Sequence, residues 1–520
     1  MKTKGLPNPG HSTEEQANAN NQTIYQSLNS LLYKELAIVF LSLIFAVFFT
    51  ASTVSAQNIP PGQDAGAQSE RFQKETEQKK EELEKKKVKA PEIEFKEKEE
   101  APKAKGPSFV LKEIKITGTT VFRPEDFFVF WQPYIGKEIS FSELEAIAEK
   151  IRAEYKQKGY LTTIVYIPEQ EIKDGQVEIR VAEGKMGDLK IEGNKWFSSS
   201  LIEKFFHLKK NEILNVVKMQ KDILRLNQNP DLELKVIVNA GKQTGTSDIT
   251  LKAKENFPFH IGVGSDNQGT RLTGKFRTSF SLRASNLTGN FDTLFMNNVF
   301  TYKSSGESLS YTIPLDTYGT KFSLDLLYFK MRLGKEYKPY EITGVTRICT
   351  PQVSKELFLS DDFQARGSLG LQIKSVKKKS EGNTTASDQL REPYFGFDFT
   401  KNDSWGGQIN FSPKFTFGTS NFLGASQRNH PTASREGTGG FFFKYEQGLS
   451  RLQRMPFDSY MSIRTQLQAT SHTLSSSDQF QLGGANSIRG YPEGDYLADN
   501  GASINFDWFF PCHWSPRTGN

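Results

Sequence analysis

Apolar and polar residues alternate along most of the second half of the chain. From about residue 257 onward they repeat every two residues, the spacing of side chains on a β-strand. In KFRTSFSLRAS one face is apolar and the other is polar. The apolar face holds Phe276, Phe280, Leu282 and Ala284. The polar face holds Arg277, Ser279, Ser281 and Arg283. DFQARGSLGLQIK, QINFSPKFTFG and MSIRTQLQAT repeat the pattern, which predicts about twelve strands in all.

Three features favour a transmembrane barrel over a soluble sandwich, in which strands would also alternate. The strands run for about ten residues, the length that a tilted strand needs to cross a bilayer. Their polar faces carry uncompensated Arg, Lys and Gln, which a water-filled lumen permits. Short turns such as 286–290 alternate with long polar segments at 377–393 and 425–440, which we expect to be loops. We therefore predict an all-β antiparallel transmembrane barrel over 256–510.

An internal repeat precedes the barrel. The segments EIKITGTTVF (113–122) and DLKIEGNKWF (188–197) align with each other. A helical pattern and then two strands follow each of them; in the first copy the helix covers 140–160. We predict an α+β region of two units with the order β-α-α-β-β, one over 108–185 and one over 186–255.

The N-terminal part of the chain differs in composition from both regions. An apolar run over 36–50, followed by Val54-Ser55-Ala56, predicts that 1–56 is an N-terminal extension with a secretory signal peptide. A single membrane anchor is the alternative. Residues 57–107 hold ERFQKETEQKKEELEKKK (70–87), whose Glu–Lys spacings favour an exposed helix. This helix is either a solvated tether or one that docks elsewhere, and the Pro/Lys/Glu-rich spacer after it should be extended.

Composition limits the function classes. The chain of 520 residues has 66 Lys and Arg against 60 Asp and Glu, and its net charge of +6 is too mild to predict nucleic-acid binding. A mean hydropathy of −0.53 excludes a helical membrane protein. The 41 Phe residues fit a barrel whose polar lumen offsets its lipid-facing side chains. Cys349 and Cys512 offer neither a disulfide framework nor a metal spacing.

The sequence shows no catalytic, metal-ligand or cofactor motif, so we predict no enzyme, no metal and no cofactor. The Gly-rich GVGSDNQG (262–269) lies on alternating strands rather than before a helix. His207 is expected to pack on an apolar helix, and Asp361-Asp362 is expected to start a strand rather than to bind a metal.

The second strand pair of the first repeat carries a specific pattern. It reads Gly159-Tyr160, a strand that ends in Pro168-Glu169-Gln170, a turn at Asp174-Gly175, and a strand that ends in Glu183-Gly184. This closely resembles the first POTRA domain of two-partner secretion transporters (TpsB), the haemolysin secretion/activation (ShlB/FhaC/HecB) family. The segments 265–292 and 308–315 resemble that family's first barrel hairpin and its Ser-Tyr-x-x-Pro strand.

The segment FQLGGANSIRGYPEGDYLADNG resembles the family's barrel-closing loop, whose tip folds back into the lumen. Its motif residues here are Gly483, Gly484, Ile488, Arg489, Gly490 and Tyr491. The resemblance implies that a lumen-buried Arg489 pairs with an acidic residue on the inner wall of a later strand.

The resemblance also implies sixteen strands, so about twelve would be present here. We expect the acidic partner of Arg489 to lie in the missing part. We interpret the chain as a fragment or frameshift product with a non-native tail at 511–520; a genuinely shorter barrel is the alternative.

The resemblance implies an outer-membrane translocase that recognises a secreted exoprotein (TpsA-like, adhesin or haemolysin type) through periplasmic POTRA domains. Export would pass through the barrel without ATP. We predict that the exoprotein adds a strand to an edge of the first unit. The residues of this edge are Leu161, Thr163, Val165, Tyr166, Pro168 and Gln170.

Further implied properties are contact with outer-membrane lipid and lipopolysaccharide, a monomeric state, and an N-terminal helix at 70–87 that can plug the barrel. The alternatives are a barrel-assembly (insertase) relative and a passive porin. The two POTRA units argue against the porin, since a pore needs no periplasmic recognition arm.

Overall fold

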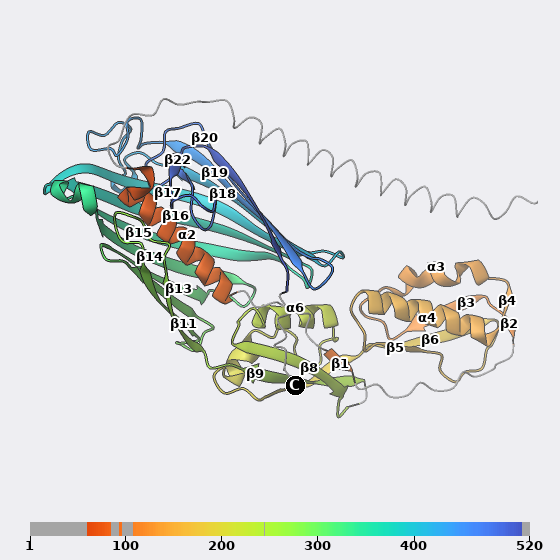
Figure 1. Cartoon of the computed structure of the whole chain (residues 1–520). Helices are drawn as coiled ribbons and strands as arrows, with labels where there is room; N and C mark the ends of the chain where they lie inside the picture. The colour runs from red at the N-terminus through yellow and green to blue at the C-terminus, as the bar shows by residue number, and fades with distance from the viewer. Residues whose placement is uncertain (1–59, 85–92, 96–107, 244, 512–520) are drawn as a thin grey trace, which may run out of the picture.

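The structure is a computed structural model that describes residues 60–84, 93–95, 108–243 and 245–511. Two small α/β units lie beside a curved twelve-stranded sheet that encloses a helix (Figure 1). The predicted signal peptide, most of the Pro/Lys/Glu-rich spacer, Cys512 and most of the predicted non-native tail lie outside the described residues. In the part that the structure describes, no helix is long and apolar enough to cross a membrane.

The first α/β unit places one long helix against a three-stranded sheet of order β3-β6-β5. Its elements are β2 (Phe109–Val110), β3 (Glu113–Thr117), η2 (Pro124–Phe127), α3 (Phe128–Trp131), η3 (Gln132–Tyr134), β4 (Glu138–Ile139), α4 (Phe141–Gln157), β5 (Ile164–Tyr166) and β6 (Gln176–Ala182). Helix α4 begins after Ser140, whose hydroxyl accepts from the N–H of Glu143, while the Glu143 carboxylate accepts from the N–H of Ser140. The apolar face of α4 is buried against the sheet, with Leu144 and Ile151 both fully buried.

The second unit repeats this order. Its elements are β7 (Lys185–Glu192), α5 (Ser199–Lys204), α6 (Val216–Leu226), β8 (Leu232–Ala240) and β9 (Thr246–Glu255). A strand from the spacer, β1 (Ile93–Phe95), pairs in parallel with β8, with Ile93 opposite Val236, so the sheet order is β1-β8-β9-β7. The β-α-α-β-β order predicted for both units is confirmed. The strand predicted over 161–170 is reduced to three residues, since a turn precedes it and Pro168 cannot donate to a ladder.

The two units meet end to end. Gly159 ends α4 in a left-handed conformation (φ 89°), which glycine adopts without strain, and its carbonyl accepts from the N–H of Val216 at 2.7 Å. Asn215 joins the two helices because its Nδ2 donates to the carbonyl of Lys158 at 3.1 Å while its Oδ1 accepts from the N–H of Lys218 at 3.0 Å. The C-terminal end of α4 therefore lies against the N-terminal end of α6.

Twelve antiparallel strands form the large sheet, so the prediction of about twelve is confirmed. They are β10 (Phe259–Asp266), β11 (Arg277–Ser285), β12 (Thr293–Phe300), β13 (Ser304–Pro314), β14 (Thr320–Arg332), β15 (Thr343–Leu359), β16 (Phe363–Ser380), β17 (Asn383–Asn402), β18 (Gly407–Gly418), β19 (Phe442–Arg454), β20 (Tyr460–Thr470) and β23 (Gly501–Phe509). Each pairs with the next in sequence, β23 follows β20, and β10 and β23 lie at the two edges. Strand length rises from 8 residues in β10 to 20 in β17.

The prediction of a loop at 377–393 is wrong. These residues belong to the hairpin of β16 and β17, which turns at Glu381-Gly382. Exposed polar residues lie on both faces of this outer end, so the alternation that marks a strand is lost there. The loop predicted at 425–440 is present and follows the short helix η5 (Phe422–Gly424). Another short helix, η4 (Lys335–Tyr340), follows β14, and the Asp361-Asp362 pair forms the turn just before β16.

Ion pairs fix the second unit to the rim of the sheet. Asp231, which is 1% exposed, accepts from Arg283 at 2.9 Å and from Ser285 at 2.8 Å and hydrogen-bonds with His260 at 2.7 Å. These three partners lie on β10 and β11.

A second anchor joins α6 to another part of the rim. Arg225 Nη2 lies 2.6 Å from Glu356 Oε1 on β15. The prediction that His207 packs on an apolar helix is wrong, because α5 ends at Lys204. Its Nδ1 lies 2.8 Å from Asp222 and its Nε2 lies 2.8 Å from Thr317 Oγ1 in the turn between β13 and β14.

Glu183 holds the first unit together at the end of β6. Its buried carboxylate accepts from the N–H groups of Thr120 (2.8 Å) and Val121 (2.9 Å) and from the hydroxyl of Tyr155 (2.8 Å). Burial alone would raise the pKa of Glu183, but these hydrogen bonds to the charged form leave its pKa below the ordinary value.

This pKa predicts how the first unit responds to acid. Because the folded-state pKa is lower than the unfolded one, the stabilisation is complete above about pH 4.3 and is lost as the pH falls through the folded pKa. Glu183→Gln should lower the free energy of unfolding by about 1–3 kcal/mol at pH 7 and weaken this dependence. Hydrogen exchange of α4 amides in the full chain, corrected for intrinsic rates, measures both. Glu171→Gln, on an exposed side chain, is the control, and equal effects of the two variants would contradict the assignment.

Candidate functional site

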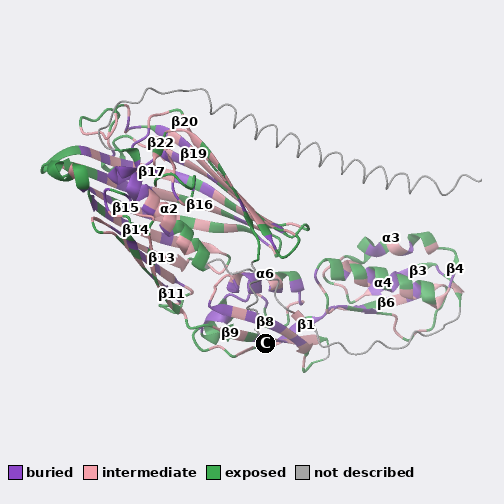
Figure 2. Cartoon of the chain, in the orientation of Figure 1, coloured by how far each residue is buried: buried purple, intermediate pink, exposed green. Residues whose placement is uncertain are grey.

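Helix α2 (Ala65–Glu84), preceded by η1 (Pro61–Gln63), lies inside the curved sheet beside β13 to β16 (Figure 1). Its N-terminal half is buried, whereas residues 81–83 are exposed (Figure 2). The expectation of an exposed helix is therefore wrong and the docking alternative is confirmed. Glu–Lys spacing does not distinguish water from a polar lumen, which explains the error.

Polar side chains of α2 meet polar side chains of the wall. Glu70 lies 3.7 Å from Lys374, Glu75 lies 2.7 Å from Arg277, and Lys80 lies 3.5 Å from Asp325. Uncharged pairs lie between them. These are Thr76 with Asn297 (2.9 Å) and Gln73 with Gln372 (3.0 Å). The wall partners lie on β11, β12, β14 and β16, and they confirm that the polar strand faces point inward.

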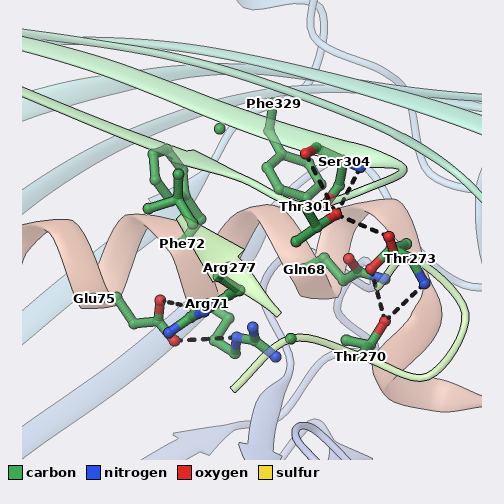
Figure 3. A pocket seen from close by; sticks show the side chains of 13 residues that line it. Gln68, Arg71, Phe72, Glu75, Thr270, Thr273, Arg277, Thr301, Ser304 and Phe329 are labelled. Atoms are coloured by element: carbon green, nitrogen blue, oxygen red, sulfur yellow. Dashed lines mark hydrogen bonds and ion pairs between the residues drawn. The ribbon is translucent and has the colours of Figure 1, made fainter. Parts of the chain in front are cut away.

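Apolar contact between α2 and the wall is small. Only Ala65 and Phe72 of the helix belong to the apolar cluster there. The ring of Phe72 lies where a side chain at Gly306 would be, and its centroid is 6.2 Å from that of Phe329. Beside it, a small cavity remains between helix and wall, lined by residues that include Arg71, Glu75 and Arg277 (Figure 3). Most of the contact is thus polar.

The predicted loop motif lies in the segment 471–500 between β20 and β23. A small hairpin, β21 (Phe480–Leu482) with β22 (Tyr496–Ala498), forms its base. The N–H of Gly483 donates to Ser487 at 2.8 Å, and the N–H of Ala485 donates to Glu493 at 2.9 Å. The loop is therefore closed on itself, with Ile488 and Tyr491 about half exposed.

Arg489 at the loop tip binds the wall. Its Nη2 lies 2.7 Å from Asp507 Oδ1 on β23, and Arg464 on β20 lies 3.1 Å from the other oxygen of that carboxylate. The Arg489 side chain is 62% exposed and that of Asp507 is 8% exposed.

The expectation that the acidic partner of Arg489 lies in the missing part is therefore wrong. The expectation that Arg489 is buried is wrong as well. Asp507 shares a polar strand face with Ser503 and Asn505. The period-two pattern of the last strand is the signal that would have found it.

The loop also contacts α2. Asp64, just before the helix, accepts from Ser476 at 2.6 Å, and Gln481 donates to the carbonyl of Ala67 at 2.8 Å. Arg71 lies 3.8 Å from Glu493. Helix and loop therefore pack against each other on the inner side of the sheet.

A buried ionic cluster lies where helix, loop and wall meet. Asp478 of the loop lies 2.9 Å from Lys374 and 3.3 Å from Lys444, and Lys374 also lies 3.7 Å from Glu392. All four side chains are at most 5% exposed. Sequence reasoning missed this cluster. Lys374 and Lys444 stand at inward positions of alternating strands, but no signal singles out Asp478.

The six residues predicted to bind the exoprotein lie on or beside β5. Leu161 and Tyr166 are exposed, whereas Thr163 and Val165 are buried. Gln170 is held on β6, where it donates to the carbonyl of Glu178 at 2.8 Å and accepts from its N–H at 2.7 Å. Three of the six are thus occupied within the unit, since Thr163 and Val165 are buried and Gln170 is hydrogen-bonded. Pro168 is half-buried.

The edge of β5 has one covered carbonyl. Arg152 of α4 donates from Nη2 to the carbonyl of Val165 at 2.8 Å. Among the described residues, β5 pairs only with β6, so its other edge carries no strand. Ile164, which the prediction omitted, is 57% exposed on this strand.

Comparison with known families decides the identity. The model of the family "Haemolysin secretion/activation protein ShlB/FhaC/HecB" matches residues 245–508, and that of "POTRA domain, ShlB-type" matches residues 109–184. The chain belongs to the ShlB/FhaC/HecB family. It is an outer-membrane transporter of two-partner secretion with POTRA domains in the periplasm. The proteins of this family are secretion proteins that export TpsA-type exoproteins.

Similar proteins agree with this membership. The heme/hemopexin transporter protein HuxB of Haemophilus influenzae is 24% identical over 381 residues, which cover 72% of this chain and 67% of HuxB. The outer membrane transporter CdiB of Dickeya dadantii is 24% identical over 437 residues, 80% of this chain and 75% of CdiB. The solved structure of CdiB from Escherichia coli has the same fold, with a TM-score of 0.70 at 19% identity, covering 89% and 86% of the two chains.

The pairing of Arg489 with Asp507 predicts a secretion phenotype for this ShlB-family chain. Arg489→Ala removes a charge-assisted bond worth about 1.5–3 kcal/mol, which should loosen the loop and lower secretion on the order of tenfold. The measurement is exoprotein in the medium at equal transporter levels in the outer membrane. Arg464→Ala removes the other cation from the same carboxylate and is the matched control. Wild-type secretion by Arg489→Ala, or an equal loss in the control, would sink the role assigned to Arg489.

Proposed function

We propose that this transporter recognises an extended, β-rich exoprotein of adhesin or haemolysin type at β5 and exports it through the lumen that α2 occupies. No ATP and no catalytic step takes part, because folding outside the cell draws the chain across. The observation that supports this proposal most directly is that α2 occupies a polar lumen mainly through polar contacts. We further propose that the protein works as a monomer in the lipid and lipopolysaccharide of the outer membrane.

The nature of these contacts supports a helix that leaves and returns. An apolar plug would expose apolar area to water on leaving, at about 25 cal/mol per Å². Polar groups such as Gln73 and Gln372 instead exchange protein partners for water, so each such hydrogen bond contributes only about 0.5–1.5 kcal/mol net. The charges that α2 leaves behind on the wall would then face a hydrated path for the exoprotein.

The strand edges support recognition at the first POTRA domain. In the second unit, β1 already occupies the edge of β8, with Phe95 opposite Val238. This pairing shows that an extended segment fits a POTRA sheet edge in this fold. At β5 the edge carries no strand in the described residues, and its exposed Ile164 and Tyr166 offer apolar surface to an incoming segment.

This proposal predicts opposite effects of two changes at β5. Arg152→Ala uncovers the Val165 carbonyl and should raise affinity for the exoprotein about fivefold, the worth of one hydrogen bond. Ile164→Ser with Tyr166→Ser removes apolar contact and should lower affinity about tenfold. Affinity is measured by calorimetry with the N-terminal part of the exoprotein whose secretion depends on this transporter. Lys150→Ala, exposed on the same helix, is the control; reduced affinity in Arg152→Ala would contradict strand addition here.

A reversible lock tests whether α2 must leave. A Cβ atom at Gly66 would lie 3.1 Å from the Cβ of Ser477 and 2.8 Å from its backbone N, so a slight outward shift of the helix brings the two Cβ atoms to the about 3.5–4.5 Å that a disulfide needs. Gly66→Cys with Ser477→Cys, in a chain with Cys349→Ser and Cys512→Ser, should stop secretion when oxidised and restore it when reduced. Each single cysteine variant is a control. Continued secretion with the disulfide formed would rule out departure of the helix.

A further inference from the structure

The outward faces of β14, β15 and β16 change from apolar to basic at one level. On these strands Phe329, Ile348 and Lys374 point inward, since they contact or cluster with α2. Their neighbours therefore point outward, because side chains alternate across a strand. The cross-strand pairing then arranges the outward side chains in rows along the sheet.

Four successive rows show the change. From the middle of the strands toward their outer ends they are Leu326–Cys349–Ile373, Tyr328–Arg347–Ser375, Lys330–Val345–Lys377 and Arg332–Thr343–Lys379. The outer end is the one opposite the POTRA domains (Figure 1). Lys330, Arg332, Arg347, Lys377 and Lys379 are all exposed, and we name these five residues the basic rim.

The basic rim lacks counter-charges. In the described part of the chain none of its five cations is within ion-pair distance of a carboxylate. Arg347 instead lies over the ring of Tyr328 at 5.7 Å. One outward-facing carboxylate, Glu307 on β13, stands opposite Tyr328 in the same row. By contrast, inward-facing cations such as Arg277 and Lys374 each have carboxylate partners.

We propose that the basic rim binds the phosphate groups of phosphorylated glycolipid headgroups in the outer leaflet of the outer membrane. The proposal rests on the orientation in the proposed function, with the POTRA domains in the periplasm. The row of Leu326 and Ile373 lies directly below the cations, where the acyl chains of such a lipid would lie. Free inorganic phosphate would bind without this apolar row.

The dimensions fit a lipid headgroup. Alternate residues on a strand are about 6.8 Å apart and neighbouring strands about 4.8 Å apart, so the basic rim covers about 10 by 14 Å. The polar zone of one leaflet is about 5–7 Å deep in an ordinary bilayer. Three rows of cations therefore fill the headgroup zone and extend beyond it, as two phosphates on a sugar headgroup require.

The test uses the full chain purified in detergent and a bisphosphorylated lipid A as the probe. Each cation near an anionic membrane surface contributes on the order of fivefold in binding, so Lys330→Gln, Arg347→Gln and Lys377→Gln together should weaken binding about 100-fold. Native mass spectrometry of the titration measures this. The matched control changes three exposed cations on the periplasmic side, Lys209→Gln, Lys401→Gln and Arg454→Gln, and should bind as the wild type does.

Two further measurements distinguish binding of a lipid phosphate from binding of free inorganic phosphate. Dephosphorylated lipid A should bind weakly, and millimolar inorganic phosphate should not displace the intact lipid. Unchanged binding by the triple variant, equal loss in the control, or full displacement by phosphate would each overturn the proposal. So would binding of the exoprotein, rather than lipid A, to the basic rim. Export and lipid binding are separate readouts, so failure of one does not imply failure of the other.

Discussion

The structure depends on the pairing of charges across a lumen that water would otherwise fill. Inward-facing cations of the wall, such as Lys374 and Arg277, each have a carboxylate on a neighbouring strand and gain further carboxylate partners from α2 and from the 471–500 segment. Burying an unpaired charge is costly, so wall, helix and loop stabilise one another as a set. The same chemistry keeps the set separable, because each charge regains hydration when its partner departs. A polar lumen thus permits both a closed resting state and a path for a polypeptide.

Recognition follows a different constraint, the need of backbone groups at a sheet edge for partners. The second unit satisfies this need within its own chain, through the spacer strand β1 on β8. In the described part of the chain, the first unit leaves β5 with only a side chain, Arg152, on one carbonyl. The two units share an order of elements but present their edges differently, and this difference supports the proposed role of the first unit as receptor. The second unit, held by Asp231 and Arg225, serves as its base.

Much of the fold follows from alternation and helix periodicity. Both units, about twelve strands and the inward polar faces follow from these patterns, because burial against lipid or a core requires them. The patterns fail where both sides of an element meet water or polar groups. The outer hairpin of β16 and β17 looks like a loop for this reason, and α2 looks like a solvated helix. Arg489 is identified from its loop, whereas alternation only places Asp507 on the inward face of the last strand and does not pair it with a particular cation. The roles of Asp478 and His207 depend on segments distant in sequence that no local pattern connects.

The junction at Asn215 has a mechanical consequence. This one side chain ties the end of α4 to the start of α6, so a displacement of the first unit acts directly on α6. Helix α6 also carries Arg225, which contacts Glu356 on β15. Contacts therefore run from the first unit through α6 to the rim of the sheet. A segment that binds the first unit and pulls on it would act, through this path, on the turns at the mouth of the lumen.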